Sequence, residues 1–342
     1  MKNLICVMLA TPLLLANKTQ ADDGPPRPEF RLSRQDEDWS AWRERASRTD
    51  FFDRVKFIPL DRDASAWLTL GGEARERYEY FRNANWGRGP QDHDGYFLHR
   101  FMVHADAHAG ETFRFFAQFK SGLEDGRHGG PRPVDRDDFD VHQLFADVGV
   151  PWADERSLTL RVGRQELTFG SQRLVSVRES PNVRQSFDGV RARLRWEGWQ
   201  FDTFATRPVE TKPGAFDDGP DSHTKFWGFY GVAPFKLVPG AKADFYYLGL
   251  ERDSAQFDQG NARELRHSIG TRLWGSAAGW DWNFEFVYQF GEFGDGDISA
   301  WTAASDTGFS FAQIPWSPRI GLKADVTSGD RNPNDHDLET FN

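Results

Sequence analysis

Apolar and polar side chains alternate with a period of two along most of the chain after residue 66. Between residues 280 and 291, for example, Trp280, Trp282 and Phe284 alternate with Asp281 and Asn283. This period is typical of a β-strand with one apolar and one polar face. The same pattern occurs at 67–81, 97–108, 112–120, 157–165, 184–196 and 317–327, and more weakly at 138–150, 199–208, 223–235, 241–251, 264–275 and 297–311. The chain is therefore predicted to be all-β, with about 13 antiparallel strands.

The connections between these strands alternate between long and short. The long ones are residues 82–95, 121–137, 166–183, 209–222 and 252–263, and the short ones are 109–111, 151–156, 197–198, 237–240 and 276–279. Outer-membrane β-barrels have short periplasmic turns, longer outer loops and strands of about 9–11 residues. A soluble, aromatic-rich β-sandwich has no reason to keep this order throughout the chain. The alternation therefore favours a transmembrane barrel.

Two polar residues interrupt the apolar strand faces. Glu76 interrupts the apolar face of residues 67–81, and His99 is the exception in residues 97–108. We interpret the position of Glu76 as a bulge or as a place at the rim of the membrane.

The composition fits a barrel that has one face in lipid. Hydrophobic residues make up 38% of the 342 residues, yet 15% are aromatic, including 13 Trp and 30 Phe. No stretch beyond the N-terminus approaches the roughly 18 apolar residues that a membrane-spanning helix needs. In water the row from Trp280 to Phe290 would favour aggregation, whereas in a bilayer it would contact lipid. The formal net charge of -10 argues against nucleic acid as a partner.

The N-terminal region is expected to consist of two parts. Residues 1–21 have the features of a secretory signal peptide: Lys2, a short apolar run, and small residues before a cut after Ala21. The only cysteine, Cys6, lies in this run, so the exported chain would carry no thiol chemistry. Residues 22–66 form a polar lead, in which residues 36–47 could make a short helix carrying Trp39 and Trp42. We interpret this lead as a periplasmic segment or a partial plug.

A long, ordered set of motifs resembles the alginate-export family of outer-membrane proteins, from about Phe30 to Asn342. The motifs are Gly163-Arg164-Gln165-Glu166-Leu167, Gly170, Arg173-Leu174-Val175-Ser176, Arg178-Glu179, Pro181-Asn182-Val183-Arg184, Ser186-Phe187-Asp188-Gly189, Gly71-Gly72-Glu73 with Arg75 and Arg77, Tyr288-Gln289-Phe290-Gly291 and Ser328-Gly329-Asp330. The resemblance implies a monomeric barrel of about 18 strands that passes alginate, an anionic polysaccharide, out of the cell. Many proteins with this domain resemble general porins.

The barrel region, residues 67–342, is expected to be incomplete at its C-terminal end. Single-chain bacterial barrels normally have an even number of strands, because hydrocarbon cannot satisfy an open sheet edge. Residues 328–342 have the composition of a loop, and in the family pattern Thr340-Phe341-Asn342 continues into further strands. We therefore expect a truncated sequence that lacks about five strands.

Basic residues gather at the polar positions that would face the lumen. The sharpest cluster is Arg191-x-Arg193-x-Arg195, whose side chains would repeat about every 6.6–7 Å along one strand. Such a ladder suits a polymer with one carboxylate per sugar, because the planar guanidinium group binds carboxylates in a bidentate manner. The alternative is that each arginine pairs with a lumen acid such as Glu73, Glu79, Asp106, Asp147, Asp202, Asp281, Glu285 or Asp325. The predicted substrate path comprises Arg75, Arg77, Arg100, Arg114, Arg161, Arg191, Arg193, Arg195, Arg272, Arg319 and Lys323, with Lys120 as a further inward-facing cation.

The long connection at residues 166–183 is rich in Arg, Glu and Asn. It could fold into the lumen as a constriction, or it could brace the outer rim as a structured loop. The residues considered for this constriction are Arg164, Arg173, Arg178, Glu179, Asn182, Arg184 and Asp188.

The sequence favours neither a metal centre nor an enzyme. His104 and His108 would lie roughly 13 Å apart on a strand, which is too far for one Zn²⁺ to join. Asp135, Asp137, Asp138 and Asp140 could hold Ca²⁺, but a solvated acidic loop fits them better. No nucleophile elbow, phosphate-binding glycine loop or metal-binding helix motif is present. We predict no cofactor and no catalytic residues.

The leading hypothesis is a passive outer-membrane channel for an anionic polysaccharide, in contact with outer-membrane lipid. The first alternative is a porin for the uptake of small anionic or sugar-like solutes. The second is a non-conducting barrel whose loops bind partners. The transported species and the direction of transport stay open at this point.

Overall fold

One antiparallel sheet of 15 strands makes up most of the protein. The computed structural model describes residues 28–44, 51–153, 156–332 and 335–342. The predicted signal peptide, residues 1–21, lies outside these residues, as do parts of the polar lead and of the predicted helix at 36–47. Apart from the two-residue strands β1 and β9, the sheet contains the predicted strands, each at the expected place in the sequence.

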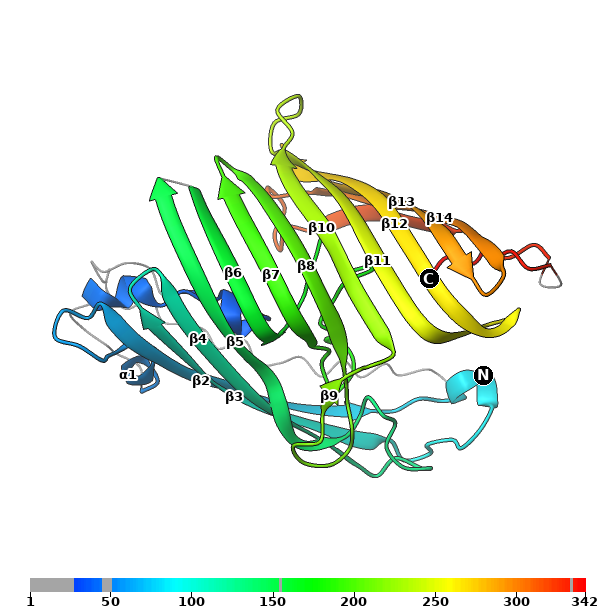
Figure 1. The fold of residues 1–342 in the computed structure, drawn as a ribbon, viewed down its shortest axis with the longest axis horizontal. Helices are drawn as coiled ribbons and strands as arrows, with labels where there is room; N and C mark the ends of the chain where they lie inside the picture. The colour runs from blue at the N-terminus through cyan, green and yellow to red at the C-terminus, as the bar shows by residue number, and fades with distance from the viewer. Residues whose placement is uncertain (1–27, 45–50, 154–155, 333–334) are drawn as a thin grey trace.

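The strands follow one another along the sheet in sequence order, with only β9 off the main path, where it pairs with β8. Figure 1 shows them side by side in a single, strongly curved sheet. Their bounds are β1 Ile58–Pro59, β2 Ala66–Glu79, β3 Tyr96–Ala109, β4 Phe113–Asp125, β5 Asp137–Ala153, β6 Arg156–Gln165, β7 Phe187–Trp196, β8 Trp199–Glu210, β9 Gly219–Pro220, β10 Thr224–Pro234, β11 Ala241–Phe257, β12 Gly260–Ala277, β13 Trp280–Phe293, β14 Gly296–Ser310 and β15 Arg319–Thr327.

Short helices occur only outside the long strands in the described part of the chain. They are the 3-10 helices η1 (Arg34–Asp36), η2 (Ser40–Glu44) and η3 (Ala84–Gly87) and the α-helix α1 (Asp53–Lys56). Trp39 and Trp42 pack with Phe57 and Trp67 in a buried cluster, so the polar lead is anchored against the start of β2. No helix in the described ranges is both long and apolar enough to cross a membrane.

The outer face of the sheet exposes large apolar side chains. Val162 is 60% exposed and Phe286 48% exposed, although both lie in the middle of long strands. Such a surface is costly in water and is the expected lipid contact of a membrane barrel. The alternation predicted from the sequence thus separates a lipid face from an inner face.

The inner, concave face is covered by two segments that are distant in sequence. Leu167, Phe169 and Val175 of the connection between β6 and β7 pack against Phe204 of β8 and Tyr230 of β10. We call residues 166–186 the inner segment. Residues 28–44, here called the N-terminal segment, cover the inner face near β2–β6 through contacts described below.

Two differences from the sequence-based strand limits concern the ends of hairpins. The predicted long loop at 252–263 is instead a tight turn, because β11 and β12 continue through it and Phe257 pairs with Gly260. Phe257 packs edge-on against Phe293, beside a cluster of Ala255, Phe293, Ile298 and Leu338. This small core stabilises the extended hairpin. The strand predicted to begin at residue 184 begins at Phe187, and Arg184 belongs to the inner segment.

The two residues that interrupt the apolar pattern are neighbours in the structure. Glu76 of β2 and His99 of β3 are cross-strand partners, and their side chains contact each other on the outer face. Glu76 lies three positions before the end of β2, which is a rim position and not a bulge. Each of the two polar side chains thus has a partner at the lipid boundary.

The sheet is curved but not closed within the described residues. On its path β15 pairs only with β14, and β2 pairs with β1 and β3. Between these edges the inner face remains accessible, and this face holds the candidate site.

Candidate lumen site on the inner face

The predicted basic positions all share the strand phase of the inner face. On β6 and β7 the register places Arg161 opposite Arg191, on the same face as Phe204 of β8. Phe204 is buried under the inner segment. The same alternation places the remaining predicted cations on this face: Arg75, Arg77, Arg100, Arg114, Lys120, Arg193, Arg195, Arg272, Arg319 and Lys323.

Two of the three arginines of β7 share a single carboxylate. Asp202 of β8 accepts hydrogen bonds from Nε of Arg191 at 2.7 Å and Nε of Arg193 at 3.0 Å. Arg195, the third of the row, forms no ion pair with any described residue. This strand therefore presents three guanidinium groups to one Asp, which leaves a local excess of positive charge.

The other predicted cations each have an acidic partner. Arg161 binds Asp147 through two hydrogen bonds of 2.7 Å, and Arg114 binds Asp106 through two of 2.8 Å. The further ion pairs are Arg75 with Glu179, Arg77 with Glu79, Arg100 with Glu73 and Glu179, Lys120 with Asp137 and Asp218, Arg272 with Asp244, Arg319 with Asp281 and Asp306, and Lys323 with Asp325. Pairing of this kind holds the strands in register and reduces the field of each individual cation.

Glu166, at the start of the inner segment, joins the two segments that cover the inner face. Its carboxylate accepts hydrogen bonds from Ser33 Oγ (2.8 Å) and Gln35 Nε2 (3.2 Å) of the N-terminal segment. His142 Nε2 of β5 lies 2.8 Å away, and Arg184 Nη2 lies 3.1 Å away. Burial acts to raise the pKa of Glu166, but the hydrogen bond with His142 and the charge of Arg184 outweigh it and lower the pKa to about 2.

A buried amide network extends from the same point. Gln143 Nε2 of β5 donates to Oε1 of Gln35 at 2.9 Å and to Oε1 of Gln118 at 2.8 Å. Arg114 Nη2 donates to the backbone oxygen of Gln35 at 2.7 Å. The N-terminal segment is thus hydrogen-bonded to inner-face side chains of β4 and β5. In the sequence of this segment, only Trp39 and Trp42 indicated that it packs against the barrel. Isolated Gln and Ser residues have no pattern that predicts such contacts.

The far end of the inner segment contacts β2 and β3. Arg75 Nη1 donates to the backbone oxygen of Glu179 at 2.8 Å, and Arg75 Nη2 donates to that of Pro181 at 2.9 Å. Asn182 Nδ2 donates to the backbone oxygens of His99, Leu123 and Asp135. The connection therefore crosses the inner face from β6 to β2, and does not project away from the sheet as a rim loop would.

The residues considered for a constriction divide into two groups. Arg173, Arg178, Glu179, Asn182 and Arg184 belong to the inner segment. Arg164 and Asp188 instead pair with each other on β6 and β7, on the same face as the outward-facing Val162, with Nε to Oδ1 at 2.9 Å. Their position differs from the sequence-based grouping because the strands extend to Gln165 and begin again at Phe187.

A cavity of about 1000 Å³ lies where the N-terminal segment meets the short-turn end of the sheet. The sheet contributes Arg114, Arg161, Arg193 and Arg195 to its lining. Other basic and acidic side chains that line it are Arg31, Asp36, Glu37, Asp38, Arg43 and Glu111. We call this cavity the vestibule. It brings the unpaired Arg195 and the acids of the N-terminal segment to one space.

The four acids considered for Ca²⁺ do not form a single cluster. Asp135 pairs with Arg132 at 2.8 Å, and these contacts outweigh the effect of its burial and lower its pKa. Asp138 pairs with Arg136 at the surface. Asp137, Asp140 and Asp218 of the 211–223 connection do converge, within 4.8 Å of one another. Lys120 Nζ lies 2.7 Å from Asp137 and 2.8 Å from Asp218, so an ammonium group already provides positive charge there.

The continuous curved sheet, its apolar outer face and its charged inner face define a channel-forming β-barrel protein of the outer membrane. The sequence model of the alginate export family matches residues 66–342. The chain belongs to this family. It is an outer-membrane channel and not an enzyme.

Solved structures of outer-membrane proteins resemble this fold. OccK3 (OpdO) of Pseudomonas aeruginosa is 11% identical, with a TM-score of 0.41 over 78% of this chain and 80% of that chain. OpdK of the same organism is 9% identical, with a TM-score of 0.41 over 77% and 82%. A loop-deletion mutant of OmpT from Vibrio cholerae is 11% identical, with a TM-score of 0.36 over 77% and 94%. A search of curated proteins finds no match to the chain.

Proposed function

We propose that the protein is a passive channel for an anionic, alginate-like polysaccharide, which moves along the arginines of the inner face. The observation that carries the proposal is the charge balance on β7, where Arg191 and Arg193 share Asp202 and Arg195 has no acidic partner in the described chain. A polymer with regularly spaced carboxylates can supply the missing partners. Arginine suits this role because it binds carboxylates in a bidentate manner.

The mixed charge of the site favours passage over tight binding. Most inner-face cations are already paired with acids, so each contact with a passing carboxylate competes with an existing ion pair. Conduction requires sites that attract an ion without retaining it. In the water-filled vestibule, screening over about 8–10 Å weakens each contact further.

The proposed form is a monomer whose inner segment narrows the path. The inner segment carries Arg173, Arg178, Glu179, Asn182 and Arg184 across the inner face, and Asn182 and Arg184 are buried beneath it. A monomer is expected because the apolar outer face contacts lipid all along the strands. Native mass spectrometry of the detergent-solubilised protein should give the mass of one chain.

Planar-bilayer recording of the full-length protein tests the proposed function. We expect a preference for anions and block of the current by oligo-uronates. The triple variant Arg191→Gln, Arg193→Gln, Arg195→Gln should lose most of both effects, because it removes the charge excess beside Asp202. The matched control Arg156→Gln changes the first residue of β6, a half-buried side chain that pairs with Glu197, and should behave like the unchanged protein.

Other outcomes point to the alternative functions. An unchanged reversal potential in the triple variant would remove these arginines from the mechanism. Currents that prefer small anions and resist oligo-uronate block would favour a porin for small solutes. Absence of conductance would favour a barrel whose loops bind partners.

A further inference from the structure

A second cavity lies between the inner segment and the wall formed by β10–β13. It has a volume of about 460 Å³, which is within the range of small-molecule sites. We call it the side pocket and define it by six of its lining residues: Val175, Arg178, Phe226, Leu248, Arg252 and Arg266. It is separate from the vestibule, since no residue lines both cavities.

The floor of the side pocket is apolar and already packed. Val175 and Leu248 are buried in the cluster that fixes the inner segment to the sheet, and Phe226 packs against that cluster. This floor does not have to form when a ligand arrives, so binding would carry little ordering cost. An apolar floor favours a ligand whose body is apolar.

Four arginines line this pocket, and one acid pairs with two of them. Glu264 pairs with both Arg252 and Arg266. Arg178 forms no ion pair with any described residue. No acidic residue belongs to the lining in the described part of the chain. The pocket therefore has an excess of positive charge above an apolar surface.

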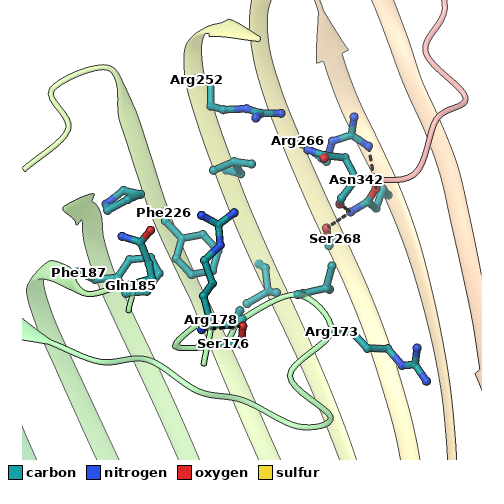
Figure 2. A pocket seen from close by; sticks show the side chains of 16 residues that line it. Arg173, Ser176, Arg178, Gln185, Phe187, Phe226, Arg252, Arg266, Ser268 and Asn342 are labelled. Carbon is teal, nitrogen blue, oxygen red and sulfur yellow. Dashed lines mark hydrogen bonds between the residues drawn. The ribbon is translucent and has the colours of Figure 1, made fainter. Parts of the chain in front are cut away.

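Two of the lining arginines, Arg266 and Arg178, have guanidinium groups that could donate to a ligand. The Arg266 side chain is only 2% exposed, and its Nη2 has no hydrogen-bond partner, although Nε binds Glu264 and Nη1 binds Gln289. A buried donor without a partner destabilises the protein, and an arriving acceptor would remove this cost. Figure 2 shows Arg178 extending from the inner segment beside Phe226, whereas Arg173 points away from the pocket. Arg173 is satisfied elsewhere by Glu285 and Asp325.

The backbone holds Arg178 in this position. Its φ of 54° lies in the left-handed region, which is rare for residues other than glycine and is found preferentially at functional sites. The Arg178 amide donates to Ser176 Oγ at 3.3 Å, within the same turn. The turn thus directs a free guanidinium group over the apolar floor.

We infer that the side pocket binds a small carboxylic acid with an apolar body. The carboxylate would accept hydrogen bonds from Arg178 and Arg266, and the body would lie on Phe226 and Leu248. This site is separate from the β7 arginines and the vestibule, on which the charge argument for the polysaccharide path rests, although Arg178 belongs to the inner segment that narrows that path.

Isothermal titration of the detergent-solubilised full chain with cyclohexanecarboxylate tests the inference. Two matched ligands separate the contributions: cyclohexanemethanol keeps the ring without the charge, and glucuronate keeps the charge on a polar ring. We expect saturable binding of cyclohexanecarboxylate, with both controls at least about tenfold weaker, which corresponds to 1.4 kcal/mol. Equal binding of either control would overturn the inference.

Variants assign the binding to the side pocket. Arg178→Gln should weaken cyclohexanecarboxylate binding by about tenfold or more. Because Arg178 is exposed and unpaired, this variant should fold normally. Arg156→Gln, at a residue outside the pocket lining, should bind as the unchanged protein does. Binding that survives Arg178→Gln, or no binding at all, would refute the site. The triple variant of Arg191, Arg193 and Arg195 should keep cyclohexanecarboxylate binding even if it loses oligo-uronate block, because none of these residues lines the side pocket.

Discussion

At the scale of the residue, Glu166 has the most connected side chain of the inner face. It accepts hydrogen bonds from the N-terminal segment and lies beside His142 of β5 and Arg184 of the inner segment. Because its pKa in the folded state is lowered to about 2, its contribution to stability is complete above the unfolded pKa of about 4.3. It is lost as the pH falls through about 2.

We predict that Glu166→Gln destabilises the protein by about 3 kcal/mol near neutral pH, because the change removes one of the two carboxylates that pair with the buried Arg184. The variant should also show a flatter stability profile between about pH 4.3 and 2. Denaturant titrations of protein in vesicles at several pH values measure both effects. The control Glu197→Gln, in an exposed pair with Arg156, should shift stability by no more than about 1 kcal/mol. Equal shifts in both variants would contradict this role of Glu166.

Gly163, next to the start of the inner segment, tests a second residue-level constraint. Its φ is +127°, and an added Cβ would lie 2.2 Å from the backbone oxygen of Leu144. Gly163→Ala should therefore cost about 2 kcal/mol or more in folding free energy. Gly219→Ala is the control, since an added Cβ there meets nothing within 4 Å. The midpoint of denaturant unfolding compares the two, and similar midpoints would show that the strand relaxes around the new methyl group.

At the scale of the element, the N-terminal segment covers part of the inner face. It is hydrogen-bonded to β4 and β5 through Gln35 and packs through Trp39 and Trp42. Its acidic residues Asp36 and Asp38 line the vestibule together with Arg195. The segment thus places carboxylates beside arginines that the carboxylates of the proposed substrate would contact.

We predict that deleting residues 28–44 raises both single-channel conductance and anion selectivity. The deletion removes material from the lumen and carboxylates from the vestibule, so cations lose an attractive surface and anions lose a competitor. The double change Asp36→Asn, Asp38→Asn serves as a second variant and should raise selectivity with little effect on conductance. Recordings in symmetric and graded salt separate the two quantities. A deletion that leaves both unchanged would exclude the segment from the conduction path.

The β11–β12 hairpin shows how local sequence can mislead at this scale. Residues 252–263 are polar and contain Gly260, which is typical of a loop. In the structure they continue as paired strands, because Ala255 and Phe257 find an apolar cluster formed with Phe293, Ile298 and Leu338. Leu338 lies far along the chain, so this contact has no signal within the hairpin itself.

For the whole molecule, the apolar outer face predicts that residues such as Val162 contact lipid. Val162, in β6 and 60% exposed, lies among other apolar residues of the outer face. Val162→Arg should cost about 2–4 kcal/mol if this face lies in hydrocarbon, whereas a water-exposed position would tolerate it within about 0.5 kcal/mol. Ser222→Arg, in an exposed connection, is the control. Stability in lipid vesicles and yield in the outer-membrane fraction measure the effect, and equal behaviour of the two variants would argue against a lipid contact at Val162.

The amino-acid pattern was sufficient to predict the β-strands and which of their residues face inward. This was possible because a strand alternates its side chains regularly, and a lipid face and a lumen face impose opposite chemistry on the two phases. Residues such as Val162 and Arg161 could therefore be assigned to opposite faces from the pattern alone. The family motif around residues 163–189 also covers the segment that lies on the inner face.

Only the tertiary structure decided what covers the inner face and how its charges are balanced. Among the described residues Arg191 forms an ion pair and Arg195 does not, and Arg178 differs from Arg173 by the direction of its side chain. Glu166 meets Ser33 across 133 positions of sequence. Such contacts depend on the curvature of the sheet and the path of the inner segment. These bring together residues that are distant in sequence and that no repeating pattern connects.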